Sequence, residues 1–257
     1  MTTKKDPVTL CITSGKGGVG KTSLAVNLAF ALAKKGPRVL VVDGDLGLAN
    51  VDVLLGLSVK RTIRDVLDSG ADPFETVVHL ERNLGILPAS SGVPEMVTLG
   101  PEEQTRLGNV LTSIASHFDY ALMDTAAGIG PSVLWFNRFA GHNMIVLSPD
   151  PASLTDAYAL IKILSRDYNR KHFHLVINFV NSDGEGRQTY EILEKVAKKF
   201  LGLNLKYLGT VPDDRVVQNA ARKQHPFIKD AQQSKAAQAL FVMADRIQML
   251  KEKPHSP

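Results

Sequence analysis

A glycine-rich octapeptide near the start of the chain constrains the fold more than any other feature. Residues 15–22 read Gly-Lys-Gly-Gly-Val-Gly-Lys-Thr and match the pattern G-x-x-x-x-G-K-[ST] at every fixed position. An apolar run over residues 8–13 comes before the octapeptide, and a helical pattern follows it. This context predicts a phosphate-binding loop between a buried strand and a helix, because glycine lets successive backbone N–H groups point at one anion. The alternative is a glycine-rich turn that binds nothing.

The pattern also assigns roles to individual side chains of the loop. Lys21 is expected to reach the β- and γ-phosphates of a nucleotide, and the Thr22 hydroxyl is expected to bind Mg²⁺. The following helix directs the partial positive charge of its N-terminus at the same anion. The residues predicted to contact the nucleotide are Gly15, Lys16, Gly17, Gly18, Val19, Gly20, Lys21, Thr22 and Ser23.

Composition limits the class of protein and its compartment. With 257 residues, 44% of them hydrophobic, the chain can bury a sizeable core, and α/β chains of this length are often single domains. Cys11 is the one cysteine, so an intrachain disulfide is excluded and a reducing compartment is favoured. Residues 1–7 are polar, and no apolar run approaches the roughly 18 residues of a membrane span. We therefore expect a cytoplasmic protein. Its net charge of +4 permits contact with DNA or anionic lipid without requiring it.

Short apolar runs alternate with helical patterns along the chain. The expected strands are residues 8–13, 38–42, 84–87, 120–124, 144–147, 174–177 and 207–211. The expected helices are residues 21–35, 101–116, 131–139, 154–169, one that aligns Thr189, Ile192, Leu193, Val196 and Phe200, and a last one over 234–250; Asp72 marks a further helix start. This alternation predicts an α/β fold with a doubly wound, mostly parallel sheet flanked by helices. Without a linker or repeat, residues 1–257 are expected to form one domain with a short polar tail, residues 251–257.

Polar residues follow the apolar run at 120–124 and extend the predicted nucleotide site. Asp124 ends this run, as a Walker B aspartate does, and is expected to hold Mg²⁺ through water. Gly128 is expected to offer its backbone N–H to the γ-phosphate. The alternative is that Asp124 caps the next helix.

Two carboxylates follow the second expected strand. Asp45 is the candidate for orienting or deprotonating the attacking water, and Asp43 is expected beside the magnesium ion. One carboxylate near the water is enough, because phosphoryl transfer depends mainly on positioning and charge stabilisation. The alternative is a turn pair, since Asp-Gly is a turn signal.

Later strand ends supply candidates for contact with the base. Asn178 follows the sixth expected strand, and Pro212 and Asp213 follow the seventh, so all three are expected to contact adenine. Guanine is less favoured, because no Asn-Lys-x-Asp element follows these strands. The alternative is that all three residues only form turns.

The loop contains a second lysine, Lys16, which a plain phosphate loop does not need. With it, residues 15–22 resemble the deviant Walker A loop of the MinD/ParA ATPases. The resemblance implies that Lys16 crosses the interface of an ATP-bound homodimer to the nucleotide of the other subunit. A cation there would offset repulsion between two triphosphates and complete a catalytic set with Lys21 and Asp45. The alternative is a solvated surface lysine.

Longer segments narrow the resemblance. Residues 43–57 and 124–130 are similar to the two switch segments of the flagellar-number regulators in this group, the FlhG/FleN proteins, and residues 153–162 are similar as well. The resemblance covers nearly the whole chain. It implies a Mg²⁺-dependent ATPase that hydrolyses ATP slowly as a homodimer and regulates flagellar number. It further implies two partners, a flagellar transcription activator that the protein restrains and a signal-recognition-type GTPase.

The two ends of the sequence affect which properties of the resembled family are expected of this chain. Residues 1–7 leave no room for the Asp-Gln-Ala helix with which some members stimulate the GTPase, so this activity is not expected. In the last helix, six apolar residues could form a lipid-facing surface and give peripheral contact with the inner face of the cell membrane. These residues are Phe241, Val242, Met243, Ile247, Met249 and Leu250. The alternative is that they pack the closing helix onto the sheet.

Other functions share the phosphate loop. A chromosome- or plasmid-partitioning or division-site-positioning ATPase of the ParA/MinD type is the alternative, and partitioning would use basic segments such as 195–199 and 222–223 for DNA contact. These segments are small, so direct DNA binding is not expected. An iron–sulfur reductase is excluded, because two copies of Cys11 cannot supply the four thiolates of a cluster. A nucleotide-gated interaction protein that hydrolysis resets is compatible with the main interpretation.

Overall fold

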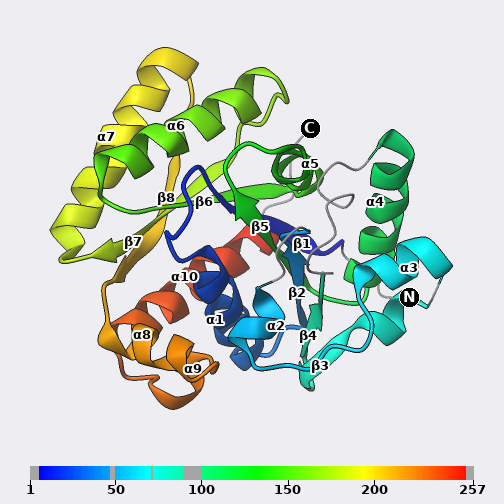
Figure 1. The fold of residues 1–257 in the computed structure, drawn as a ribbon. Coiled ribbons are helices and arrows are strands. Elements are labelled where there is room, and N and C mark those ends of the chain that lie inside the picture. Colours follow the sequence, from blue (N-terminus) through cyan, green and yellow to red (C-terminus); the bar gives the residue numbers. More distant parts are fainter. Residues whose placement is uncertain (1–5, 47–49, 71, 90–99, 253–257) are drawn as a thin grey trace.

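The computed structural model describes residues 6–46, 50–70, 72–89 and 100–252. One eight-stranded sheet runs through this part of the chain, with helices on both of its faces (Figure 1). The strands are β1 (Val8–Ser14), β2 (Val39–Gly44), β3 (Val78–Glu81), β4 (Leu84–Leu87), β5 (Tyr120–Ala127), β6 (His142–Leu147), β7 (Phe173–Val180) and β8 (Lys206–Pro212). The helices are α1 (Lys21–Lys34), α2 (Val51–Leu54), α3 (Ile63–Ser69), the 3₁₀ turn η1 (Pro73–Thr76), α4 (Pro101–Ala115), α5 (Pro131–Phe139), α6 (Pro151–Arg166), α7 (Asp183–Leu201), α8 (Arg215–Arg222), α9 (Phe227–Asp230) and α10 (Lys235–Glu252).

The strand order places the glycine-rich loop at the topological switch point. The order is β3-β4-β2-β5-β1-β6-β7-β8, and every neighbouring pair is parallel except β3 with β4. The expected doubly wound, mostly parallel sheet is therefore confirmed. From β1 the order runs outward in both directions, and ligands of such sheets bind at the carboxyl ends of the strands beside this point.

Alternate residues of the central strands face different layers of the core. Leu10 and Ile12 pack with α1, α9 and α10, whereas Cys11 packs with α3, α4 and α5 on the other face. A third apolar cluster lies under α6 and α7. Because both faces of the central strands are covered, these strands are apolar throughout, which is why their sequence positions are predictable.

The polar ends of several elements lie beyond the predicted bounds. β5 continues to Ala127 and β7 to Val180, because the backbone ladder continues past the polar residue that interrupts each apolar run, Asp124 in β5 and Asn178 in β7. α6 begins at Pro151 and not at residue 154, since Asp150 caps it by accepting the N–H of Ser153. At Asp72 the predicted helix start is confirmed, although only one 3₁₀ turn follows.

The predicted face of α7 is wrong for two of its members. Thr189 and Leu193 are buried, but Ile192 and Phe200 are 49% and 57% exposed. Positions 192, 196 and 200 form their own i, i+4 row, and Ala197, not Phe200, continues the buried one. The sequence contains two apolar rows on this helix, and only tertiary packing decides between them.

The six apolar residues of the last helix do not share one surface. Met243 and Ile247 are fully buried against the sheet, whereas Val242 and Met249 are exposed. A lipid-facing surface made of all six residues is therefore wrong, and packing of a closing helix accounts for the buried ones. The helix extends to Glu252, and residues 253–257 of the predicted tail lie outside the described residues.

Short elements were not predicted from the sequence. They are α2, α3, β3, α8 and α9, and each is at most eight residues long. Of the similar segment at 43–57, residues 47–49 lie outside the described part of the chain. Within the described residues, no helix is long and apolar enough to cross a membrane.

Candidate nucleotide-binding site

The loop between β1 and α1 has the backbone of an anion cradle. Gly18 and Gly20 have φ values of +77° and +87°, which favour glycine, and Gly20 is the N-cap of α1. A Cβ on Gly20 would lie 2.4 Å from Asn178 Nδ2, and one on Gly15 would lie 2.3 Å from the Asp156 carbonyl carbon. Val19 is buried and anchors the loop. The loop is thus held between the end of β7 and helix α6 by contacts that only glycine allows.

Lys21 lies folded back into the loop. Its Nζ donates to Ser14 Oγ at 2.9 Å, and Ser14 Oγ donates to the Lys16 carbonyl at 2.6 Å. Burial lowers the pKa of Lys21, while the Asp124 and Asp45 carboxylates oppose this change. The ammonium group is therefore poorly solvated, and a phosphate would replace water around it. Sequence reasoning missed Ser14, since a serine that ends a strand carries no signal of its own.

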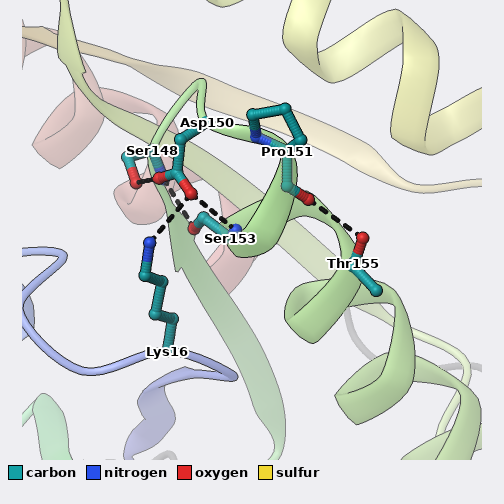
Figure 2. Close-up of polar contacts among 6 residues, drawn as sticks. All are labelled: Lys16, Ser148, Asp150, Pro151, Ser153 and Thr155. Carbon is teal, nitrogen blue, oxygen red and sulfur yellow. Dashed lines mark hydrogen bonds and ion pairs between the residues drawn. The ribbon is translucent and has the colours of Figure 1, made fainter.

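Lys16 is held within its own chain (Figure 2). Its Nζ lies 2.9 Å from Oδ1 of Asp150, which also accepts the Ser153 N–H, and Oδ2 accepts the Ser148 hydroxyl at 2.5 Å. Hydrogen bonds from Ser148, Lys16 and Ser153 hold the pKa of Asp150 well below its usual value. Both side chains of the ion pair are about 40% exposed, so it contributes at most about 1 kcal/mol. Lys16 can leave this contact at little cost.

Sequence reasoning also missed Asp150. The signal was present, because Asp-Pro followed by Ser153 is an N-cap with proline at the first helical position. The same carboxylate that caps α6 thus receives the lysine of the loop (Figure 2).

Asp43 fastens the segment that follows β2. Its carboxylate accepts the backbone N–H groups of Asp45, Asn50 and Val51 at 3.0–3.1 Å. Burial, only partly offset by these bonds, raises its pKa to about 6. In this arrangement the Asp43 oxygens hold backbone, and its predicted place beside magnesium stays a prediction.

Asp124 is directly opposite Asp43 in the register of β2 and β5. Burial raises its pKa to about 7, and a hydrogen bond with the Thr22 side chain opposes the rise. Its Oδ1 is buried and has no hydrogen-bond partner in the described part of the chain. A buried carboxylate oxygen without a partner is costly, and a hard cation would satisfy it. Asp124 and Thr22 therefore fit Mg²⁺.

No cluster of three or more His, Cys, Asp and Glu side chains that could hold a metal occurs among the described residues. The donor set at Asp124 and Thr22 does not need such a cluster, because Mg²⁺ usually takes one or two protein oxygens together with phosphate and water.

The other predicted residues lie around the same edge of the sheet. Asp45 is half-buried, and its Oδ2 accepts from Asn50 Nδ2 at 3.4 Å. The Gly128 N–H donates to the Ser14 carbonyl at 2.8 Å, and Gly128 has a φ of +92°. Contact of this N–H with a γ-phosphate would require that bond to break, so the role of Gly128 also stays a prediction.

The predicted base contacts separate into two places. Asn178 is buried and donates to the Val19 carbonyl at 2.8 Å, so it braces the loop. Pro212 and Asp213 line a cavity of about 770 Å³ between β8, α10 and the start of α7. The Asp213 N–H also donates to the Val180 carbonyl at 3.0 Å, which ties the two strand ends together.

Phe179 follows Asn178 in β7, and sequence reasoning did not single it out. Phe179 has a φ of +60°, which costs a bulky residue about 1–3 kcal/mol.

A comparison with protein-family models decides the family. The model of the CobQ/CobB/MinD/ParA nucleotide binding domain matches residues 10–227. The chain belongs to this family. Its glycine loop, Thr22 and Asp124 thus lie in a nucleotide-binding domain.

Curated relatives of this family member include flagellar proteins. The chain is 42% identical over 238 residues to the antiactivator FleN of Pseudomonas aeruginosa, covering 93% of this chain and 85% of the relative. It is 38% identical over 216 residues to the flagellum site-determining protein YlxH of Helicobacter pylori, covering 84% and 73%. The predicted resemblance to the flagellar regulators of the MinD/ParA group is therefore confirmed.

Solved structures of family members share the architecture. The septum site-determining protein MinD from Pyrococcus horikoshii, complexed with Mg-ADP, has a TM-score of 0.79 and 25% identity, covering 95% of this chain and 97% of that one. MinD in the MinC:MinD complex of Aquifex aeolicus has a TM-score of 0.76 and 28% identity, covering 97% and 98%. The expected MinD-like P-loop fold is thus confirmed.

Proposed function

We propose that this chain is an ATPase that binds Mg²⁺ and ATP at the loop between β1 and α1 and forms a homodimer in its ATP-bound state. The observation that carries the proposal is the buried Asp124 oxygen, which lacks a partner in the described residues and lies near Thr22 at the N-terminus of α1. Carboxylate, hydroxyl and glycine loop together form a cradle for a metal-bound phosphate. We further propose that residues 1–257 form one domain and that the protein is cytoplasmic.

Each residue of the site has a role in this proposal. Backbone N–H groups of residues 15–20 and Lys21 bind the phosphates, while Thr22 and, through water, Asp124 hold Mg²⁺. When bound there, Mg²⁺ would supply positive charge to neutralise the transferred phosphoryl group. Asp45 orients or deprotonates a water molecule. The oxygen of this water bonds to the γ-phosphorus as the bond from the γ-phosphorus to the β–γ bridging oxygen breaks, which gives ADP and phosphate.

Lys16 supplies the contact between subunits. In the proposal it leaves Asp150 and reaches the nucleotide of the other copy, where its charge offsets repulsion between two triphosphates. Its contact with Asp150 is exposed enough to exchange readily. Asn178, Pro212 and Asp213 are proposed to contact the adenine.

The relatives support a role in flagellar regulation. We infer that the ATP-bound dimer restrains a flagellar transcription activator and acts alongside a signal-recognition-type GTPase to set flagellar number. The identities of 42% and 38% to FleN and YlxH support this output over division-site positioning, for which the MinD of Helicobacter pylori is 30% identical. Hydrolysis then serves as a timer that resets the dimer.

Light scattering coupled to size-exclusion chromatography tests the dimer. The variant Asp45→Ala should retain ATP and elute as a dimer with Mg-ATP, but as a monomer with Mg-ADP or without nucleotide. Asp68 is exposed and lies on α3, so Asp68→Ala is the control for the loss of a carboxylate and should behave like the wild type. A monomer of Asp45→Ala at micromolar concentration in saturating Mg-ATP would contradict the proposal.

The ATP-locked dimer can then be offered to the activator. We expect Asp45→Ala with ATP to capture a purified flagellar activator, and the ADP form to release it. Steeply salt-dependent binding to nonspecific DNA, without capture of the activator, would instead support a partitioning ATPase.

A further inference from the structure

The end of β7 forces an aromatic side chain into an unusual position. Among non-glycine residues of the described chain, positive φ occurs at Asn169, Phe179 and Gln224, and only Phe179 is bulky and lies in a strand. The pairing with β8 steps from Asn178 opposite Val211 to Val180 opposite Pro212, so Phe179 is left out of register as a bulge.

The residues on both sides keep this conformation in place. Asn178 is buried and bonded to the Val19 carbonyl, and Val180 is buried and accepts the Asp213 N–H. Bulges of this kind re-aim a side chain, and strained residues cluster at ligand sites. Phe179 is therefore held in its unusual conformation between two fixed neighbours.

The ring of Phe179 lies against the glycine loop. A Cβ placed on Gly20 would be 3.2 Å from Phe179 Cζ, and Gly20 is the N-cap of the helix that directs its N-terminus at the phosphates. Phe179 also lines an apolar cavity of about 40 Å³ together with Ser23 and Leu24. This cavity is too small for a base, while Phe179 remains 37% exposed to solvent.

We propose that the exposed face of the Phe179 ring is the stacking platform for the base of the bound nucleotide. The inference rests on the proposed nucleotide binding and adds a residue that sets affinity for the base. A single ribose joins the base of a nucleotide to its phosphates. If the phosphates bind at the loop, the base therefore lies close to Gly20. An aromatic face that is fixed at this distance gains by stacking on any base, because every base has a π-face. The ring therefore strengthens binding without selecting between adenine and guanine.

Calorimetric titration with Mg-ATP and with Mg-tripolyphosphate, which has no base, separates the two contributions. Phe179→Ala should bind Mg-ATP about 5- to 100-fold more weakly than the wild type, from the usual effect of removing one stacked ring. Its affinity for Mg-tripolyphosphate should change less than about 2-fold, since the loop and Lys21 are unaltered. Phe179→Tyr should bind both ligands like the wild type.

The variant Phe179→Gly controls for backbone strain. It removes the ring and also tolerates the positive φ, so it should lose ATP affinity as Phe179→Ala does. Unchanged ATP affinity in both variants would overturn the inference. An equal loss for ATP and tripolyphosphate would also overturn it, because the ring would then act by holding the loop. If the wild type bound neither ligand, the proposed function itself would fail.

Discussion

Two buried ionisable residues, Asp124 and His174, have opposite relations to the site. Asp124 lies in the carboxyl-terminal half of β5 and has a buried oxygen without a partner in the described residues, which supports its proposed contact with a metal ion. His174 is near the amino end of β7, where its Nε2 lies 3.4 Å from Nδ1 of His142. Burial and the nearby His142, Lys206 and His172 lower the pKa of His174 from 6.5 to about 3. His174 is thus remote from the candidate site, and its titration bears on the stability of the fold.

The shift at His174 predicts acid lability. Because the folded pKa lies below the unfolded value, the unfolded chain binds a proton first, and stability present above pH 6.5 is lost as the pH falls toward 3. The loss is at most about 1.4 kcal/mol per pH unit. In urea unfolding between pH 7 and 5, His174→Gln should show a shallower decline than the wild type, by roughly 1–2 kcal/mol in total.

The exposed His79→Gln on β3 is the matched control and should keep the wild-type slope. Equal slopes for the wild type and His174→Gln would show that another group causes the acid lability.

At the scale of elements, burial on both faces decides which parts of the fold were predictable. β1, β2, β4 and α5 agree closely with their predicted ranges, because continuous apolar runs and proline or glycine boundaries fix them locally. The short helices α8 and α9 could not be found, since helices of one or two turns depend on tertiary packing. The same limit explains the error on α7, where two apolar rows compete.

The site was predictable to a similar extent. A motif with fixed spacing specified the loop, Thr22 and Asp124, and the structure brings them together. Ser14, Asp150 and Phe179 were missed, because their importance arises from partners distant in the sequence or from a bulge. No local pattern encodes such partners.

The mixed burial of α10 predicts a contrast between neighbouring apolar residues. Ile247→Ala should lower the free energy of unfolding by about 2–4 kcal/mol, since Ile247 is fully buried and its loss leaves a cavity. Met249→Ala should change it by less than about 0.5 kcal/mol, because Met249 is 60% exposed. Chemical denaturation monitored at Trp135 measures both. If Met249→Ala proved as costly as Ile247→Ala, the described orientation of α10 would be wrong.

At the scale of the molecule, one edge of the sheet gathers segments from across the chain. Five different strands supply these segments: the glycine loop and Asp150 follow β1 and β6, whereas Asp43, Asp124 and Asn178 lie in the carboxyl-terminal halves of β2, β5 and β7. Parallel strands deliver all of them to the same side, and the switch point beside β1 leaves room for a ligand there. A nucleotide bound at this edge would lie close to segments from several strands at once. Its phosphate state could therefore change the shape of a whole face.

The position of Lys16 predicts that its substitution affects dimerisation and not the binding of Mg-ATP. Lys16→Ala should bind Mg-ATP within about 3-fold of the wild type, since Lys21 and the loop amides remain, but should stay monomeric in light scattering. Lys162→Ala, an exposed lysine on α6, should dimerise normally. Asp150→Asn keeps the N-cap of α6 and removes the charge that holds Lys16, so it should dimerise at least as readily as the wild type. Dimerisation of Lys16→Ala would remove the role assigned to this lysine.

The close fit of Gly15 against Asp156 couples the position of the glycine-rich loop to that of α6. Since even a methyl group would not fit between the loop and the backbone of α6, neither can shift without pushing the other. A partner that displaced α6 would therefore also displace the proposed phosphate-binding loop, and would change nucleotide binding from a contact on the outer side of the helix.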